Sequence, residues 1–175
     1  KSIANGIDII RIFDALNDPR NLETSINATK KEGGHVQAAF SYTTSPVHSN
    51  EYFAAFAKQL ENMGADSVCI KDMSGLLKPY AAYELVKKLK ETVSLPIELH
   101  THYTSGLASM TILKAVEAGV DIVDTAISPF AMGTSQAPTE SIVAALAGTE
   151  YDTGLDLKKL DRISRYFTPI REKYI

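Results

Sequence analysis

Cysteine is almost absent from the 175 residues of this chain, and tryptophan does not occur at all. The single cysteine, Cys69, excludes an internal disulfide and a zinc cluster built from several thiolates, so any metal would need nitrogen and oxygen ligands. A lone thiol is typical of proteins in a reducing compartment. The cytoplasm is therefore the location that the sequence predicts.

Strong charge and long apolar runs are also missing. The net charge is −3 and no block of basic residues occurs, which argues against a nucleic-acid partner. No apolar run approaches the roughly 18 residues that a membrane-spanning helix needs. We expect neither a signal peptide nor a membrane segment in a stretch that begins with Lys1.

The sequence does contain a repeating unit. Gly-x-Asp tripeptides at residues 6–8, 64–66 and 119–121 each precede a short apolar run, and two further runs follow Gly33-Gly34 and Leu95-Pro96. Runs this short and this apolar are typical of strands that are buried on both faces of a parallel sheet. Five strands are predicted, at residues 9–13, 36–42, 67–70, 97–101 and 122–127.

Helical patterns alternate with these runs. Ser49 is a suitable N-cap, and Pro79 is a suitable first residue of a helix. Four helical patterns end just before a glycine, as expected at the C′ position; these are Gly33, Gly64, Gly119 and Gly148. Helices are predicted at residues 22–31, 49–63, 105–118 and 138–147, with one starting at Pro79 and an additional one at 155–174.

Strands that alternate with helices in this way predict an α/β fold with a parallel sheet. An open, doubly wound sheet and a closed (β/α)₈ barrel both fit the alternation. A closed barrel typically needs about 250 residues and eight units. In the barrel interpretation, this chain therefore holds about five units, and three lie elsewhere.

Polar side chains gather where the predicted strands end, which is where α/β proteins place reactive groups. The strand ends carry Asp14, residues 41–44, Lys71-Asp72, His100 and His102, and residues 128–136. Because side chains alternate along a strand, the two histidines project from the same face of the sheet. Two imidazoles placed in this way are able to bind one metal ion.

Simpler interpretations stay open for these residues. The two histidines could be hydrogen-bonded loop residues instead of metal ligands. Lys71 could be a buried lysine that pairs with Asp72 or Asp14, instead of a ligand or a catalytic group. Asp14 could form a turn together with residues 17–19.

Four segments together resemble the carboxyltransferase domain of biotin-dependent enzymes. They are IFDALND (12–18), CIKDMSGLLKP (69–79), ELHTHYTSG (98–106) and VDTAISPFAMGTSQAPTES (123–141). This family includes the oxaloacetate decarboxylase α subunit, the pyruvate carboxylase B subunit and the transcarboxylase 5S subunit. The resemblance covers the whole chain. A KDM motif followed by HTH and then by a TSQ loop is far more specific than a lone HxH.

The resemblance implies a TIM barrel. Residues 1–150 would form strands four to eight of that barrel, and residues 151–175 would form an appended helix that leads to a following domain. His100, His102 and a carbamylated Lys71 would bind one divalent ion, either zinc, manganese or cobalt, at the barrel mouth. The aspartate that is the family's fourth ligand and the arginine that binds the substrate lie on earlier strands, which this chain lacks.

Catalytic roles also follow from the resemblance. Lys71, Asp14 and Thr134 would be catalytic, with Asp14 near the substrate. Thr134 would contact biotin and pass a proton between biotin and the enol. The reaction would transfer a carboxyl group between oxaloacetate or pyruvate and biotin, through an enolpyruvate that the metal stabilises.

The implied partners are a biotin carrier domain on a separate domain or subunit, because no biotinyl-lysine motif occurs, and a second copy of the chain in a homodimer. A further partner would be either a membrane-bound decarboxylase subunit or a biotin carboxylase subunit. Decarboxylation of oxaloacetate is the predicted reaction. Three alternatives remain: a pyruvate carboxylase B subunit that works in the carboxylating direction, a metal-dependent acyl-CoA lyase or synthase with an HxH pair, and an inert barrel fragment.

Overall fold

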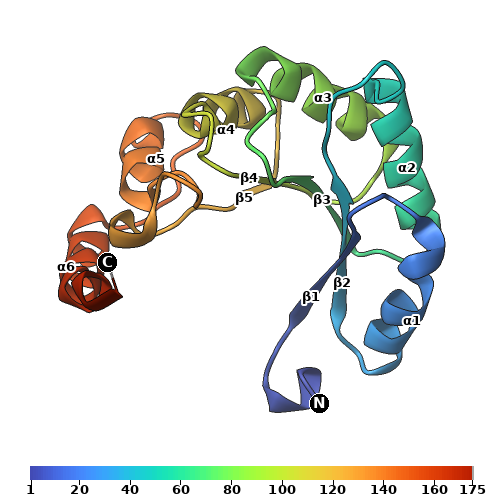
Figure 1. Cartoon of the computed structure of the whole chain (residues 1–175), viewed down its shortest axis with the longest axis horizontal. Helices are drawn as coiled ribbons and strands as arrows, with labels where there is room; N and C mark the ends of the chain where they lie inside the picture. The colour runs from blue at the N-terminus through green and yellow to red at the C-terminus, as the bar shows by residue number, and fades with distance from the viewer. Residues whose placement is uncertain (175) are drawn as a thin grey trace.

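The computed structural model describes residues 1–174 and contains one five-stranded sheet with helices along one side of it (Figure 1). The strands are β1 (Ile9–Asp14), β2 (His35–Ser41), β3 (Ser67–Asp72), β4 (Ile97–Thr101) and β5 (Ile122–Val123). The α-helices are α1 (Glu23–Lys31), α2 (Asn50–Asn62), α3 (Pro79–Thr92), α4 (Ala108–Glu117), α5 (Thr139–Leu146) and α6 (Leu157–Arg171). Four short 3-10 helices complete the order: η1 (Ile3–Asn5), η2 (Pro19–Asn21), η3 (Ser128–Phe130) and η4 (Glu172–Tyr174).

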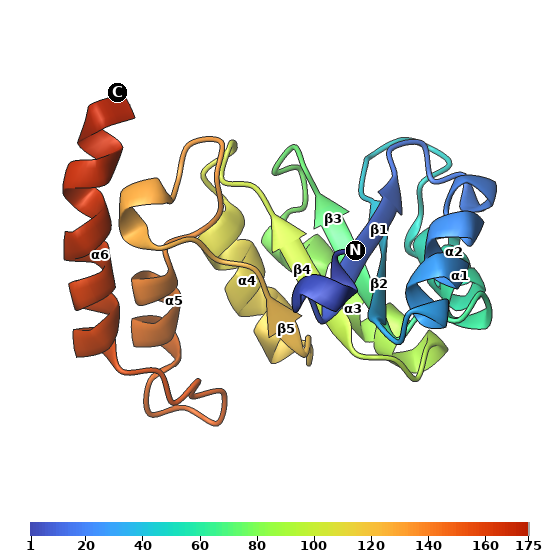
Figure 2. The same ribbon diagram turned by 90° about the horizontal axis from the view of Figure 1, so that it is seen from below.

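The five strands are parallel and lie in chain order, β1-β2-β3-β4-β5. Figure 1 shows a curved sheet with the helices outside the curve, and Figure 2 shows α6 beside α5 at the end of the molecule far from α1. The predicted α/β class with a parallel sheet is therefore confirmed.

Local sequence signals place most element ends as predicted. The Ser49 side chain accepts a hydrogen bond from the backbone N–H of Tyr52 at the start of α2, and Pro79 is the first residue of α3. The predicted glycines follow the C-caps of α1, α2, α4 and α5, all with positive φ. The fourth strand has the bounds that the sequence predicts.

Several elements are shorter than predicted, among them the fifth strand and α4. The fifth strand contains only Ile122–Val123, because after Val123 the chain leaves β4 and Ala126 pairs with Pro138. Helix α4 starts at Ala108 instead of residue 105, because the Ser105 hydroxyl donates to the carbonyl of Gly75 and holds the preceding turn in place.

The prediction that the strands are buried on both faces holds only for the middle of the sheet. Every residue of β2 after His35 is buried, and Lys71 and His100 are the partly exposed residues of β3 and β4. On the edge strand β1 the prediction is wrong, because Ile9 is 52% exposed and Phe13 is 45% exposed. One long side of this strand has no neighbouring strand among residues 1–174.

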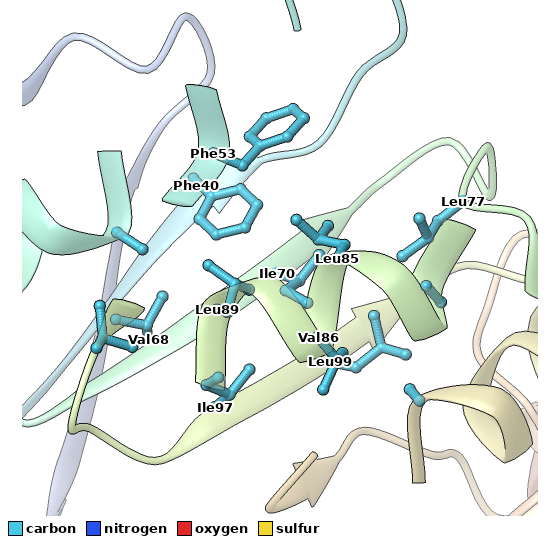
Figure 3. Packing of buried hydrophobic residues seen from close by; sticks show 14 of the residues in the cluster. Phe40, Phe53, Val68, Ile70, Leu77, Leu85, Val86, Leu89, Ile97 and Leu99 are labelled. Atoms are coloured by element: carbon cyan, nitrogen blue, oxygen red, sulfur yellow. The ribbon is translucent and has the colours of Figure 1, made fainter. Parts of the chain in front are cut away.

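The hydrophobic core lies between the sheet and the helices (Figure 3). Phe40 of β2 stacks on Phe53 of α2 with ring centroids 5.0 Å apart. The buried stripe of α3 packs on alternate residues of β3 and β4, as Figure 3 shows for Leu85 and Leu89 near Ile70. Burial of each such side chain contributes about 1.5–3 kcal/mol.

Helix α6 differs from the other α-helices because none of its residues is buried. It contacts α5 and η3, and the rings of Phe130 and Phe167 lie 5.5 Å apart. The predicted additional helix is confirmed in position, whereas the domain boundary near residue 150 stays a prediction. No helix among residues 1–174 is long and apolar enough to cross a membrane.

Candidate functional site

The candidate site lies on the face of the sheet that the helices do not cover. Ile70 and Leu99 pack toward the helices. Because side chains alternate along a strand, their neighbours Lys71 and His100 point to the opposite face, which we call the inner face. The register pairs Lys71 with His100 on adjacent strands, so both lie at the same height on that face.

The two histidines face one another across a short gap. The Nε2 atoms of His100 and His102 are 3.1 Å apart. The other ring nitrogen of each histidine has an oxygen partner: Nδ1 of His100 lies 2.7 Å from Oδ2 of Asp124, and Nδ1 of His102 lies 2.6 Å from the carbonyl oxygen of Thr134. The structure therefore brings the predicted pair together.

These oxygen partners determine where each imidazole carries its proton. A carbonyl oxygen and an ionised carboxylate can only accept hydrogen bonds, so Nδ1 of each ring donates. Nη1 of Arg11 also lies 3.3 Å from Nδ1 of His100, but this contact is longer than the 2.7 Å between Nδ1 and Asp124, and Nη1 donates to Asp124 instead. In the neutral rings, both Nε2 atoms then carry a lone pair. Two lone pairs at 3.1 Å repel one another unless a cation or a proton lies between them. Histidines that bind metals typically have their second nitrogen held by a carboxylate or a carbonyl in this way.

Asp124 is ionised in this arrangement. Burial raises the pKa of its carboxyl group, but hydrogen bonds from His100 and Arg11 outweigh burial and hold the pKa well below its usual value. Nη1 of Arg11 donates to Oδ2 of Asp124 over 2.7 Å. The carboxylate that holds His100 is therefore itself held by a guanidinium.

Arg11 is also bound by two further side chains of the inner face. Its Nε donates to Oε1 of Gln37 over 2.5 Å, and its Nη2 forms an ion pair with Glu98. Glu98 additionally accepts from Gln37. Burial, a hydrogen bond with Asp124 and the negative charge of that carboxylate raise the pKa of Glu98 to about 7, and the charge of Arg11 offsets this only in part.

Lys71 is partly exposed, and its ammonium lies over the ring of Phe13, 4.7 Å from the ring centroid. Phe13 belongs to β1, on the side of β3 away from the histidines. The interpretation that Lys71 pairs with Asp72 or Asp14 is wrong, because both of these carboxylates are engaged elsewhere. Asp72 points to the helix side of the sheet, since it is the next residue along the strand.

Asp72 is fully buried and organises the loop after β3. Its carboxylate accepts from the backbone N–H groups of Leu76 and Leu77 and from the hydroxyl of Thr101. The same loop needs glycine at position 75, where φ is +65° and a Cβ would lie 2.7 Å from the carbonyl oxygen of His102. This loop therefore fits closely against the strand end that carries the histidines.

Asp14 closes the turn after β1. Its Oδ2 accepts from the backbone N–H groups of Leu16 and Asp18, and its Oδ1 accepts from Asn21. The hydrogen bonds from Asp18 and Asn21 lower the pKa of this carboxyl group. The turn interpretation of Asp14 is thus confirmed as a structural role, and its catalytic role stays a prediction.

Thr134 lies in the loop before α5 and is exposed. The contact with His102 is made by its backbone carbonyl and not by its hydroxyl. The loop is also tied to the histidine strand by the neighbouring Ser135, whose carbonyl accepts from the N–H of Tyr103 over 2.7 Å. Thr134 therefore lies next to the predicted histidine ligands. It contacts His102 through its backbone carbonyl, an atom that the sequence analysis did not consider.

Sequence reasoning missed Arg11, Glu98 and Asp124. Glu98 lies two residues before His100, so its side chain points to the same face of the sheet as the two histidines. Arg11 interrupts an otherwise apolar run. Both features could have indicated a position on the inner face. The two other histidines lie elsewhere: His35 contacts Ser67, and His48 packs on Tyr52. Within residues 1–174, no group of three or more His, Cys, Asp or Glu side chains has metal-binding geometry. The predicted third ligand, Lys71, is outside those residue types.

Known proteins similar to this chain span its whole length. Residues 15–167 match the family model described as HMGL-like. The B subunit of pyruvate carboxylase from Methanocaldococcus jannaschii is 66% identical over 174 residues, which are 99% of this chain and 31% of that protein. The methylmalonyl-CoA carboxyltransferase 5S subunit of Propionibacterium freudenreichii subsp. shermanii is 48% identical over 176 residues, which are 99% of this chain and 35% of that protein.

A solved structure shares the fold closely. The carboxyl transferase domain from Rhizobium etli pyruvate carboxylase, solved with pyruvate and biocytin, matches with a TM-score of 0.97 and 44% identity. The match covers 99% of this chain and 30% of that chain. These comparisons confirm the resemblance to carboxyltransferase domains and the assignment of the sheet to part of a TIM-barrel-type fold. The chain spans about a third of the length of the relatives it matches.

Proposed function

The chain belongs to the HMGL-like family, and on this basis we propose that it contributes the last five strands of a carboxyltransferase barrel that transfers a carboxyl group between biotin and pyruvate or oxaloacetate. Residues 1–150 would be strands four to eight of that barrel. Residues 151–175 would connect it to a following domain. The names of the relatives, the pyruvate carboxylase B subunit and the methylmalonyl-CoA carboxyltransferase 5S subunit, support this class of reaction.

The single observation that carries the proposal is the pair of Nε2 atoms of His100 and His102, 3.1 Å apart with both Nδ1 atoms bonded to oxygen. This donor set fits a divalent cation of the zinc, manganese or cobalt type, because neutral imidazoles are ligands for such ions and their second nitrogens are fixed. When bound, the ion would act as a Lewis acid toward negative charge that develops on a substrate oxygen.

Lys71 would supply the third ligand after reaction with CO₂. The ammonium would first lose a proton to solvent, and the neutral amine would then attack the carbon of CO₂. A C–N bond would form while one C=O π bond opens onto its oxygen, and a second proton would leave the nitrogen, so that an anionic carbamate replaces the ammonium. The ammonium is attracted to the face of the Phe13 ring. A carbamate loses that attraction and would favour a cation beside His100, its register partner.

Asp14 and Thr134 would act on the substrate side of this centre. Thr134 is exposed at the mouth, and its hydroxyl would pass a proton between biotin and the enol. Asp14 would keep the turn after β1 in place beside the bound keto acid. Its three hydrogen bonds favour this positioning role.

Biotin would arrive on a separate carrier domain or subunit. A biotin carboxylase subunit is the partner that pyruvate carboxylase relatives favour, and a membrane-bound decarboxylase partner is the alternative. The homodimer and the cytoplasmic location predicted from the sequence remain part of the proposal. The partner sets the direction of the reaction, because the residues of the site serve both directions.

The proposal is tested by measuring bound metal and the decarboxylation of oxaloacetate with free biotin in the natural polypeptide. We expect His102→Asn and Lys71→Arg each to lower the activity by more than about a hundredfold, because each removes a ligand. His48→Asn is the matched control, since this histidine packs on Tyr52 away from the inner face. Metal content and activity that are unchanged in all three variants would overturn the proposal. Full activity of Lys71→Arg alone would remove the carbamate from the proposal, whereas a protein without metal and without dependence on Lys71 would leave the acyl-CoA lyase and the inert fragment as alternatives.

A further inference from the structure

The two histidines of the inner face are held in different ways. His102 is oriented by a backbone carbonyl, that of Thr134, which no substitution of a side chain removes. His100 is oriented by a side chain, Asp124, which in turn is bound by Arg11. The position of His100 therefore depends on a chain of two side chains, each of which can be exchanged.

The side chain of Asp124 depends on the hydrogen bond from Arg11 for its orientation. Asp124 comes directly after the two-residue strand β5, at the edge of the sheet, and its backbone N–H donates to the carbonyl of Leu99. Its side chain is 32% exposed. A partly exposed carboxylate on a short edge strand has several rotamers available, and only its hydrogen bonds select the one that reaches His100.

Arg11 provides the support from the opposite edge of the sheet. It lies on β1, and its guanidinium reaches across the inner face to the residue that follows β5. Gln37 on β2 and Glu98 on β4 hold the guanidinium between these edges. Each of the three guanidinium nitrogens of Arg11 thus binds a side chain of the protein.

We propose that Arg11 and Asp124 are positioning residues that fix the tautomer of His100 and thereby keep its Nε2 available for a cation shared with His102. This inference rests on the proposed function for the identity of the cation, but the tautomer of His100 is a property of the chain itself. Neither residue touches the substrate or the cation in this assignment. Substituting Asp124 should change the tautomer of His100 and leave that of His102, which the carbonyl of Thr134 holds.

The test is the ¹⁵N spectrum of histidine side chains in the natural polypeptide, labelled with ¹⁵N-histidine and stripped of metal by a chelator. His100→Asn and His102→Asn assign the two signals. We expect both wild-type rings to carry the proton on Nδ1. In Asp124→Asn the amide is able to donate to Nδ1, so His100 should shift toward the form with the proton on Nε2. His102 should keep its proton on Nδ1, and its Nε2 signal should move only as expected for an atom that accepts a hydrogen bond from His100.

Zinc affinity gives the second readout, measured by competition with a coloured chelator. Asp124→Asn should weaken zinc binding about 10- to 100-fold, as is typical when the residue behind a ligand is lost. Arg11→Lys should weaken it less, and Asp124→Glu should restore part of the loss. Asp161→Asn on α6 is the charge-matched control, because it pairs with Arg165 on an exposed helix face.

The results of these two measurements distinguish a failure of this inference from a failure of the proposed function. An unchanged His100 tautomer in Asp124→Asn, with zinc affinity within about twofold of wild type, overturns the positioning role even if the enzyme is active. A purely structural role would lower the unfolding temperature without moving the His100 signal, and would overturn it equally. If the wild type binds no zinc and transfers no carboxyl group, the proposed function fails, while the metal-free spectrum still decides the role of Asp124.

Discussion

The two faces of one sheet carry opposite kinds of side chains. Alternate residues of β2, β3 and β4 that point to the helices are almost all apolar and have no exposed surface, as for Phe40, Ile70 and Leu99. The inner face carries Glu98 and His100 of β4, together with Arg11 of β1 and His102 directly after β4. Within five parallel strands, the period of two thus separates the apolar groups of the core from the polar groups of the candidate site.

This difference has an energetic consequence. Apolar side chains that lie between sheet and helices contribute through burial, which needs only the right size and shape. Charged side chains on the inner face lose solvation, and each is compensated by a specific partner, as Arg11 is by Asp124. Substitutions on the helix side should therefore lower stability, and substitutions on the inner face should lower activity or metal affinity with less effect on stability.

The largest expected effect on stability is that of Phe53→Ala on α2. Its ring is fully buried and stacks on Phe40, so truncation leaves a cavity in the centre of the core. We expect the free energy of unfolding to fall by about 3–5 kcal/mol, as measured by urea unfolding of the natural polypeptide. Leu16→Ala is the control, because Leu16 is 88% exposed. Equal effects of the two variants would contradict the assignment of Phe53 to the centre of the core.

The second prediction concerns Thr134→Ala at the mouth of the inner face. The substitution removes the hydroxyl but keeps the carbonyl that holds His102. If the hydroxyl passes the proton, oxaloacetate decarboxylation should fall about a hundredfold or more, while zinc affinity and the free energy of unfolding stay as in wild type. Wild-type activity in this variant would remove Thr134 from proton transfer and leave it only as the residue that orients His102.

The third prediction compares two neighbours in the sequence that point to opposite faces. Asp72→Ala leaves two backbone N–H groups and the Thr101 hydroxyl without an acceptor in a buried loop, and should lower the free energy of unfolding by about 1–3 kcal/mol. Lys71→Met loses the contact with Phe13, a cation–π interaction of about 0.5–1 kcal/mol at exposed sites. Both are measured by urea unfolding of the metal-free protein. A larger loss for Lys71→Met than for Asp72→Ala would reverse the assignment of the two faces.

Much of the fold could be predicted from the sequence, because its signals are local. The N-cap Ser49, the first-turn Pro79 and the bounds of β4 are each encoded within a few residues. The fifth strand was predicted too long, because its apolar run does not show that the chain leaves β4 after Val123 to pair with the segment before α5.

The site was predictable only in part. The shared face of His100 and His102 follows from their spacing, and the structure agrees. The partner of His100 does not follow from spacing, because Asp124 and Arg11 are 113 residues apart in the chain and meet only through the curvature of the sheet. The predicted pairing of Lys71 with Asp72 was wrong for a different reason. Adjacent residues of a strand point to opposite faces of the sheet, so the carboxylate of Asp72 could not reach Lys71.

The smallest predicted effect lies in the helix layer, far from the inner face, and depends on pH. Glu61 near the end of α2 accepts hydrogen bonds from Lys58 and from the hydroxyl and backbone N–H of Ser94, just before β4. These bonds lower the pKa of Glu61 to about 2. A carboxyl group whose pKa is lower in the folded state stabilises the fold above its ordinary pKa, and this contribution is lost as the pH falls toward 2. Glu61→Gln should therefore be less stable than wild type at pH 7, with the difference shrinking below about pH 4.5. Urea midpoints of both proteins, measured across this pH range, check the prediction. A difference in stability that stays constant down to pH 2 would mean that the charge of Glu61 contributes nothing to its hydrogen bonds with Lys58 and Ser94.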